Sequence, residues 1–425
     1  MKTSIDKIFP ALPTNRREIK IKLDLLEEEL SSWNPKSRLG TLHTEPTRGS
    51  MAIWKRFIKY NPNNLGNWSY QKGELLGTKK VEREVILTMI DLYGESSRRI
   101  EGYLSSGGTE SNLFSIWTGR KYLKGLNKKN KICLLRTSLT HYSITKAADI
   151  CNIPDYLVPL NREHWNMDKH GLEQEIIRRY RNGYRGFLIP LTTGYTLTGT
   201  SDDINGTIKT IEYLNKKLKH FNVFIWIDAA LNGLIAPFVT NDFKPFASSY
   251  VQTVVVDFHK FGLVPYPAGI ILYRKNLRKL IEKTIDYLPE KDSTIAGSRT
   301  GISAIAIWAQ LHLLGKSGYR YLTERQIKNK KYFIKSIQAK LPGVKIITDE
   351  NSLSCGLIFN PCKNKKLPIN IENKYGLYAG KIRCLFYPNT WERAIIYKFF
   401  FLPHTTKTIV GDFIYDVSKY LEIEE

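Results

Sequence analysis

The chain has 425 residues, 42% of them hydrophobic and 12% aromatic, and a formal net charge of +24. This composition excludes a disordered protein, and the length allows two or three domains with a sizeable core. No stretch reaches the roughly 20 apolar residues that a membrane-spanning helix needs, and the first residues lack the apolar segment of a secretory signal. We therefore expect a folded protein without a membrane span.

The cysteines are few, odd in number and widely separated. None forms a Cys-x-x-Cys pair, which argues against a disulfide framework and against a structural zinc site. The histidines also lack the spacing of metal ligands, so we predict no metal site. This cysteine usage favours a reducing compartment and predicts a cytoplasmic location. The five cysteines are Cys133, Cys151, Cys355, Cys362 and Cys384.

The excess of basic residues has two interpretations. A cationic surface is typical of proteins that bind nucleic acid, but lysine and arginine also accumulate on solvated helix faces. The basic clusters at 120–131, 178–185 and 325–340 are interleaved with apolar residues at helical spacing. Because no nucleic-acid-binding motif accompanies them, we expect solvated faces and no nucleic-acid partner.

The chain divides into three parts in this interpretation. Residues 1–55 form an arm that prolines interrupt, with one helix predicted over 16–30. Residues 56–305 form a large domain in which apolar runs alternate with amphipathic helices such as 110–123, and residues 306–425 form a small α+β domain. Buried strands separated by helices predict an α/β fold with a mostly parallel sheet covered on both faces. Predicted strands in the large domain are 131–136, 186–191, 223–227, 251–256 and 269–273; the rest of the chain is expected to hold a long helix over 303–341, strands at 357–359 and 397–402, and a last helix.

Polar residues follow several of these strands, where ligands collect in such sheets. Gly107, Gly108 and Thr109 open a helix, either as a phosphate-binding turn or as an ordinary cap. Asp228 ends a buried strand, where a carboxylate needs a cation, a helix cap or a salt bridge. His141, taken alone, has a structural and a catalytic interpretation.

Lys260 lies just beyond the apolar run 251–256, next to His259. Desolvation there should lower the pKa of its amine and make it a better nucleophile, although a surface lysine is the simpler alternative. The order of these residues is more informative than any one of them. A phosphate turn, a histidine, an aspartate and then a lysine suit pyridoxal phosphate: the lysine forms a Schiff base, the aspartate pairs with the ring nitrogen, and a flat side chain stacks on the ring.

On these residues the sequence resembles the group II pyridoxal-phosphate-dependent amino-acid decarboxylases. The resemblance covers about residues 60 to 320. Through Gly-Ser-Arg-x-Gly at 297–301 the sequence is similar to histidine or serine decarboxylase-like proteins. Through Asp-x-His-Lys at 257–260 it is similar to archaeal-type tyrosine/aspartate decarboxylases. The other matching segments are 63–66, 102–110, 141–143, 194–200 and 228–230.

The resemblance implies a type I (aspartate aminotransferase-like) fold with pyridoxal 5'-phosphate as cofactor. It makes Lys260 the Schiff-base lysine and Asp228 the partner of the pyridinium nitrogen. It places Ala230 and His141 on opposite faces of the ring and Thr196 close to the lysine. It also implies that the cofactor phosphate is bound by Gly107, Gly108, Thr109 and His259.

The implied reaction removes the α-carboxylate of an L-amino acid as carbon dioxide and leaves an amine. Candidate substrate-binding residues are Asn64, Arg299 and Lys398. Lys398 occupies a segment where some relatives carry a carboxylate-binding arginine, and for Arg299 a structural ion pair at the subunit interface is the alternative. The resemblance also implies a homodimer with its active site at the interface. Two alternatives stay open: a sphingosine-phosphate-lyase-like carbon–carbon lyase, and a basic polyanion-binding protein on an inactive scaffold.

Overall fold

The computed structural model describes residues 15–32, 34, 37–42, 44–68, 78–240, 243–286, 290–359 and 366–422. The beginning of the predicted arm and Cys362 lie outside these ranges. Within them, no helix combines the length and the apolar character needed to cross a membrane.

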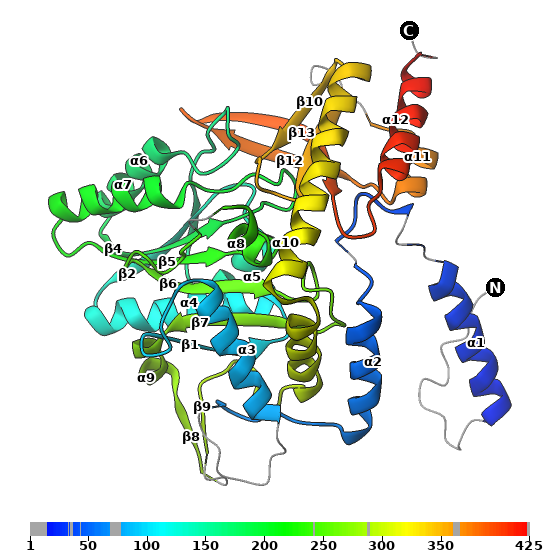
Figure 1. The fold of residues 1–425 in the computed structure, drawn as a ribbon. Helices are drawn as coiled ribbons and strands as arrows, with labels where there is room; N and C mark the ends of the chain where they lie inside the picture. Colours follow the sequence, from blue (N-terminus) through cyan, green and yellow to red (C-terminus); the bar gives the residue numbers. More distant parts are fainter. Residues whose placement is uncertain are drawn as a thin grey trace.

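A seven-stranded sheet forms the centre of the large domain (Figure 1), in the order β1-β7-β6-β5-β4-β2-β3. All neighbours are parallel except that β7 runs antiparallel to both β1 and β6. This confirms the predicted mostly parallel sheet. The strands are β1 (Ile100–Ser105), β2 (Lys131–Arg136), β3 (Asp155–Leu157), β4 (Tyr184–Thr192), β5 (Asn222–Asp228), β6 (Val251–Asp257) and β7 (Gly269–Arg274).

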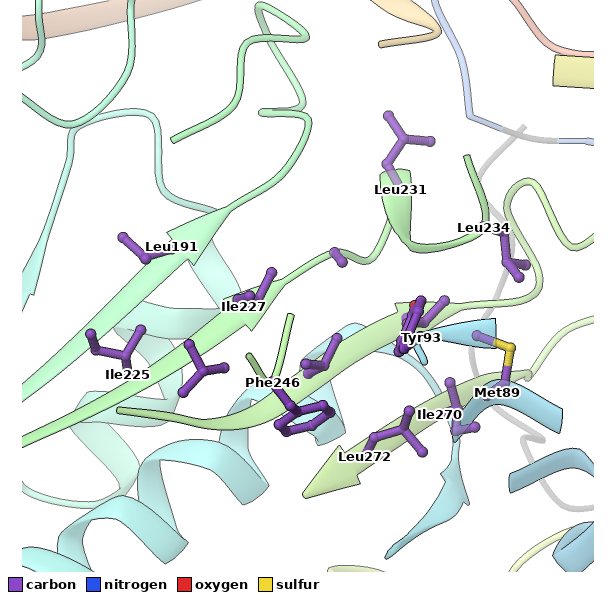
Figure 2. Packing of buried hydrophobic residues seen from close by; sticks show 14 of the residues in the cluster. Met89, Tyr93, Leu191, Ile225, Ile227, Leu231, Leu234, Phe246, Ile270 and Leu272 are labelled. Carbon is purple, nitrogen blue, oxygen red and sulfur yellow. The ribbon is translucent and has the colours of Figure 1, made fainter. Parts of the chain in front are cut away.

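Successive side chains along each strand point to opposite faces of the sheet and pack into two separate cores, one on each face. In β5, Ile225 and Ile227 enter the core beneath α3 (Thr78–Leu92), while Phe224 and Trp226 enter the core beneath α4 (Gly108–Leu126). Figure 2 shows the first core, where Met89 and Tyr93 lie against the sheet. Helices α6 (Lys169–Arg181), α7 (Ile204–Lys217) and α8 (Ala236–Val239) cover that face as well, and α5 (Tyr142–Ile150) and α9 (Arg278–Ile281) cover the other.

The small domain has its own antiparallel sheet and its own core. The 40-residue α10 (Gly301–Lys340) connects the two domains: Ile307 packs in the large-domain core and Phe333 in that of the small domain, with a kink at Gly315, whose φ is 59°. The predicted boundary after residue 305 therefore falls inside one helix, and the domain division stays a prediction. The elements of the small domain are β10 (Val344–Thr348), β11 (Ser354–Phe359), α11 (Ile369–Tyr375), β12 (Ala379–Phe386), β13 (Thr390–Phe400) and α12 (Lys407–Glu422).

The arm contributes α1 (Arg16–Ser32) and α2 (Arg48–Phe57). Every residue of α1 is exposed, and the helix stands apart from the body in Figure 1. Between the two helices the chain runs close to the large domain, where the Thr44 hydroxyl donates to the Lys260 carbonyl at 2.9 Å. The remaining short elements are η2 (Ile58–Tyr60), η3 (Asn232–Leu234), η4 (Lys275–Leu277), β8 (Lys283–Ile285) and β9 (Glu290–Asp292).

Candidate active site

A cavity of about 380 Å³ opens at the carboxyl ends of β4, β5 and β6, beside the N-termini of α4 and α5. This is the sheet edge at which the sequence predicts a ligand. The cavity brings together every residue predicted to be catalytic or to bind the cofactor: Gly107, Gly108, Thr109, His141, Thr196, Asp228, Ala230, His259 and Lys260.

The two glycines leave room that a side chain would fill. Gly107 has a φ of 147°, and a Cβ added to it would lie 2.8 Å from His259 Cε1; at Gly108 the added Cβ would lie 3.2 Å from Asp257 Oδ2. Gly107 is also the N-cap of α4 and provides no side-chain cap. The first amide groups of the helix can therefore approach an anion such as a phosphate.

Asp228 is a buried carboxylate that faces the cavity, with only 4% of its surface exposed. Its Oδ2 accepts from Asn112 Nδ2 at 3.0 Å, and its Oδ1 accepts from the Ala230 amide at 3.2 Å. Both donors are neutral, so the negative charge remains available to a cationic group such as a protonated ring nitrogen.

Lys260 Nζ lies 3.0 Å from Asp257 Oδ2, at the end of β6. Burial lowers the pKa of Lys260, but the carboxylates of Asp257 and Asp228 outweigh burial and the pKa is raised. The predicted fall in this pKa is therefore wrong. The prediction considered the desolvation of Lys260 but not its ion pair with Asp257.

His141 caps α5, and its Nδ1 accepts from the Ser143 amide at 3.3 Å and lies 2.8 Å from Ser143 Oγ. Its pKa is lowered, mainly by burial and also by the cations of Lys260 and Lys398, against the opposing effect of Asp228 and Asp257. It is therefore a neutral imidazole at physiological pH.

The second histidine of the cavity, His259, stacks on Tyr266 with ring centroids 4.1 Å apart. Its Nδ1 accepts from the Ala268 amide at 3.3 Å, and burial lowers its pKa. This ring forms the wall of the cavity beside the glycine turn.

Asn64 and Arg299 do not line the cavity. Both side chains are buried around Glu82: Arg299 Nη1 lies 2.6 Å from Glu82 Oε1, and Asn64 donates to Oε2 at 2.7 Å. Arg299 also donates to the carbonyls of Leu104 and Gly66. Arg299 thus forms a buried ion pair within its own chain, whereas the alternative predicted from the sequence placed such a pair at the subunit interface.

Lys398 lies on β13, outside the residues that line the cavity, yet its charge influences the pKa of His141. No carboxylate in the described part of the chain forms an ion pair with it. Burial alone lowers its pKa. A partly buried cation without an anionic partner beside the cavity is a candidate for binding an anionic substrate group.

Several lining residues were not among the predicted site residues: Asn112, Leu139, Tyr195, Asp257 and Tyr266. Asp257 could have been found, because it ends a buried strand three residues before Lys260. Asn112 lies inside α4 and carries no local signal. The Tyr195 hydroxyl donates to Asp202 Oδ2 at 2.8 Å, so the side chain of this bulky residue is held in place at the cavity wall.

Residues 80–359 match the family model described as "Pyridoxal-dependent decarboxylase conserved domain". The match covers about two thirds of the chain. The chain belongs to this decarboxylase family. It is a pyridoxal-phosphate-dependent enzyme that decarboxylates an amino acid, and the glycine turn, Asp228 and Lys260 suit the phosphate, ring nitrogen and aldehyde of that cofactor.

The decarboxylase is similar to a tryptophan decarboxylase of Clostridium sporogenes, with 29% identity over 86% of this chain and 84% of the relative. Its fold matches that of L-methionine decarboxylase from Streptomyces sp. 590, with a TM-score of 0.83 and 18% identity over 97% and 98% of the two chains. A sphingosine-1-phosphate lyase of Burkholderia pseudomallei matches at a TM-score of 0.76 and 16% identity, over 97% and 92%. The last two likenesses concern the fold alone, so decarboxylation is supported by the family match and not by the fold.

Proposed function

We propose that Lys260, Asp228, His141 and Thr196 carry out the decarboxylation of an L-amino acid in this cavity. The observation that supports the proposal is the convergence of an amine, a buried carboxylate and an imidazole, from three different strand ends, around a glycine turn. The bound pyridoxal phosphate supplies an electron sink for the electron pair left at Cα when carbon dioxide departs.

The residues around the cofactor have complementary tasks in this proposal. Gly107, Gly108 and Thr109 present amide and hydroxyl donors to the phosphate, next to His259. Asp228 would keep a proton on the ring nitrogen, because its hydrogen bonds from the Asn112 amide and the Ala230 backbone leave its negative charge in place.

The cavity walls orient the reacting bond. Ala230 and His141 would lie against the two faces of the cofactor ring, and Thr196 lines the same cavity as Lys260. With pyridoxal phosphate bound, Lys260 Nζ would be the amine that holds the aldehyde of the cofactor, and the same amine would be able to carry a proton. Lys398 attracts the carboxylate of the incoming substrate, while Asn64 and Arg299 support the chain behind the cavity through Glu82.

Carbon dioxide release from single amino acids tests this proposal. Purified enzyme with added cofactor is assayed with histidine, tyrosine, aspartate, serine and tryptophan. One of them should release carbon dioxide and an equal amount of amine, and Lys260→Ala should abolish both. Activity that survives Lys260→Ala would contradict the proposal; Lys316→Ala, which changes an exposed lysine, is the matched control.

We also propose a homodimer that α1 helps to hold together. Four exposed apolar side chains, Ile19, Leu23, Leu26 and Leu30, follow the alternating four- and three-residue spacing of a helix-pairing seam. The charges of α1 are unevenly distributed. Its first seven residues contain four cations (Arg16, Arg17, Lys20 and Lys22) and one carboxylate (Glu18), whereas Asp24, Glu27, Glu28 and Glu29 make its second half acidic. An antiparallel pair of α1 helices from two copies places the basic end of one against the acidic end of the other, as a two-fold interface requires.

Sedimentation equilibrium tests this pairing. Leu23→Glu with Leu26→Glu should raise the dimer dissociation constant at least about tenfold. Ile21→Glu with Leu25→Glu changes the opposite side of the same exposed helix and should have little effect. Equal dissociation constants for the two double variants would contradict the proposed seam.

We further propose a cytoplasmic location, which the four described cysteines, all free and buried, support.

A further inference from the structure

One amide side chain connects the two catalytic side chains that come from different strand ends. Asn112 lies on α4 with 1% of its surface exposed, between Asp228 at the end of β5 and the His141 cap of α5. Its Nδ2 lies 3.0 Å from Asp228 Oδ2 and 3.1 Å from Ser143 Oγ.

The orientation of this amide follows from its third partner. Trp226 Nε1 lies 3.0 Å from Asn112 Oδ1, and an indole nitrogen can only donate. Asn112 Oδ1 must therefore be the acceptor, and both hydrogens of Nδ2 point toward Asp228 and Ser143. Trp226 is fully buried in the core beneath α4, so the anchor is rigid.

The direction of the next bond is then fixed as well. Ser143 Oγ receives a hydrogen from Asn112, so its own hydrogen is free to donate to His141 Nδ1, 2.8 Å away. The Ser143 amide also donates to Nδ1. A hydrogen on Nδ1 would face both donors, so the neutral ring carries its hydrogen on Nε2.

We propose that Asn112 is a positioning residue that fixes His141 as the Nε2–H tautomer and fixes the orientation of the Asp228 carboxylate. This inference rests on the proposed roles of His141 and Asp228. With Nδ1 occupied by Ser143, Nε2 is the remaining nitrogen of the ring, and it is a hydrogen-bond donor. A donor at this place stabilises an anionic substrate group, whereas the other tautomer would repel it.

Long-range ¹⁵N–¹H NMR of histidine-labelled protein without cofactor tests the tautomer separately from activity. The His141 signals are assigned by their loss in His141→Gln. We expect an unprotonated Nδ1 and a protonated Nε2 in the wild type. In Asn112→Asp, which keeps the shape and the acceptor for Trp226, the Ser143 hydroxyl can turn toward the new carboxyl, and we expect a mixture of tautomers. Protonated Nδ1 in the wild type, or an unchanged tautomer in the variant, overturns the inference.

Kinetics with added cofactor test the functional part. Asn112→Asp and Asn112→Leu should lower kcat at least about tenfold with a smaller change in KM, because a misplaced donor acts mainly in the transition state. Ser115→Ala is the matched control: this buried α4 hydroxyl pairs with Thr253 Oγ1 at 2.6 Å, so its loss affects packing but leaves the tautomer and kcat unchanged. A mixed tautomer with wild-type kcat overturns the positioning role. A wild-type enzyme with the expected tautomer but no decarboxylation contradicts the proposed function instead.

Discussion

The Lys260 ammonium lies 3.0 Å from the Asp257 carboxylate, and both groups are largely removed from water at the end of β6. The ion pair stabilises the folded protein, but it also keeps Lys260 protonated and so makes its amine less nucleophilic. It holds the pKa of Lys260 above its usual value even though burial lowers it. The favourable interaction is fully present below the unfolded-state pKa of lysine and is lost as the pH rises through the higher folded-state pKa.

Asp257→Asn should make Lys260 more reactive in the protein without cofactor. Removing one of the two carboxylates that oppose burial lowers the pKa of Lys260, so more free amine is present at pH 8. We expect Lys260 to react with acetic anhydride at least about tenfold faster, because one pKa unit is a factor of ten. Peptide mass spectrometry measures the rate. Asp155→Asn, which breaks an ion pair with Arg136 at the edge of the sheet, is the control; equal Lys260 rates in both variants would show that Asp257 does not hold the proton.

Gly107→Ala should weaken cofactor binding. The added Cβ would lie 2.8 Å from the His259 ring on a backbone with a φ of 147°, so the phosphate turn must shift. The dissociation constant of pyridoxal phosphate, measured by fluorescence titration, should rise at least about tenfold. Gly125→Ala lies in the last turn of the same helix with nothing within 4 Å of the added Cβ. It should leave cofactor affinity unchanged and stabilise the protein by about 0.5–1 kcal/mol.

Lys398→Met should make the protein more stable and a poorer enzyme. The variant removes a partly buried cation whose pKa burial lowers, and it keeps the apolar stem. Urea unfolding should show a gain of about 1 kcal/mol, while KM for the substrate rises because the carboxylate loses its cation. The same change should raise the pKa of His141, since Lys398 is one of the cations that lower it. A loss of stability with unchanged KM would assign Lys398 to packing instead.

Asp202 should give the stability of the fold a pH dependence in the mildly acidic range. The carboxyl is buried and accepts from the amides of Met167 and Thr192 and from the Tyr195 hydroxyl, and burial raises its pKa to about 6. Because the pKa is raised, this contribution to stability is fully present below the unfolded-state pKa near 4, falls between pH 4 and pH 6, and is lost once the pH has risen through the folded-state pKa. The decline amounts to about 3 kcal/mol for a shift of about two units.

Comparing wild type with Asp202→Asn isolates this contribution. The variant lacks the titration but loses hydrogen bonds, so it is less stable at every pH. The difference between the two free energies of unfolding, measured in urea from pH 4 to pH 8, should shrink as the pH rises. A difference that stays constant would mean that Asp202 is ionised throughout.

Much of the fold follows from the sequence because apolar runs specify buried strands directly. The run predicted at 131–136 has the bounds of β2, and the runs that became β4 to β7 were found to within two residues. Strand β1 was missed because Glu101 and Gly102 interrupt its apolar pattern. The structure explains both: Glu101 pairs with Arg278, and a Cβ at Gly102 would lie 2.3 Å from the Ile271 carbonyl oxygen on the neighbouring strand.

The site could be predicted where each residue sits at a strand end, as Asp228 and Lys260 do. What the sequence could not give is which side chains from distant segments meet. Arg299 meets Glu82 across 217 positions, and Asn112 meets Asp228 across 116. The pKa of Lys260 depends in part on the same kind of meeting, because Asp228 of β5 adds to the effect of the nearby Asp257.

The measurement that tests the central claim most directly is borohydride reduction of the protein with pyridoxal phosphate, followed by peptide mass spectrometry. Lys260 should carry the reduced cofactor in one-to-one amount, and the unreduced protein should show an absorption band at about 410–430 nm that reduction removes and that Lys260→Ala lacks. A cofactor label on Lys398 or on surface lysines, with Lys260 unmodified, would contradict the assignment of Lys260 as the catalytic lysine.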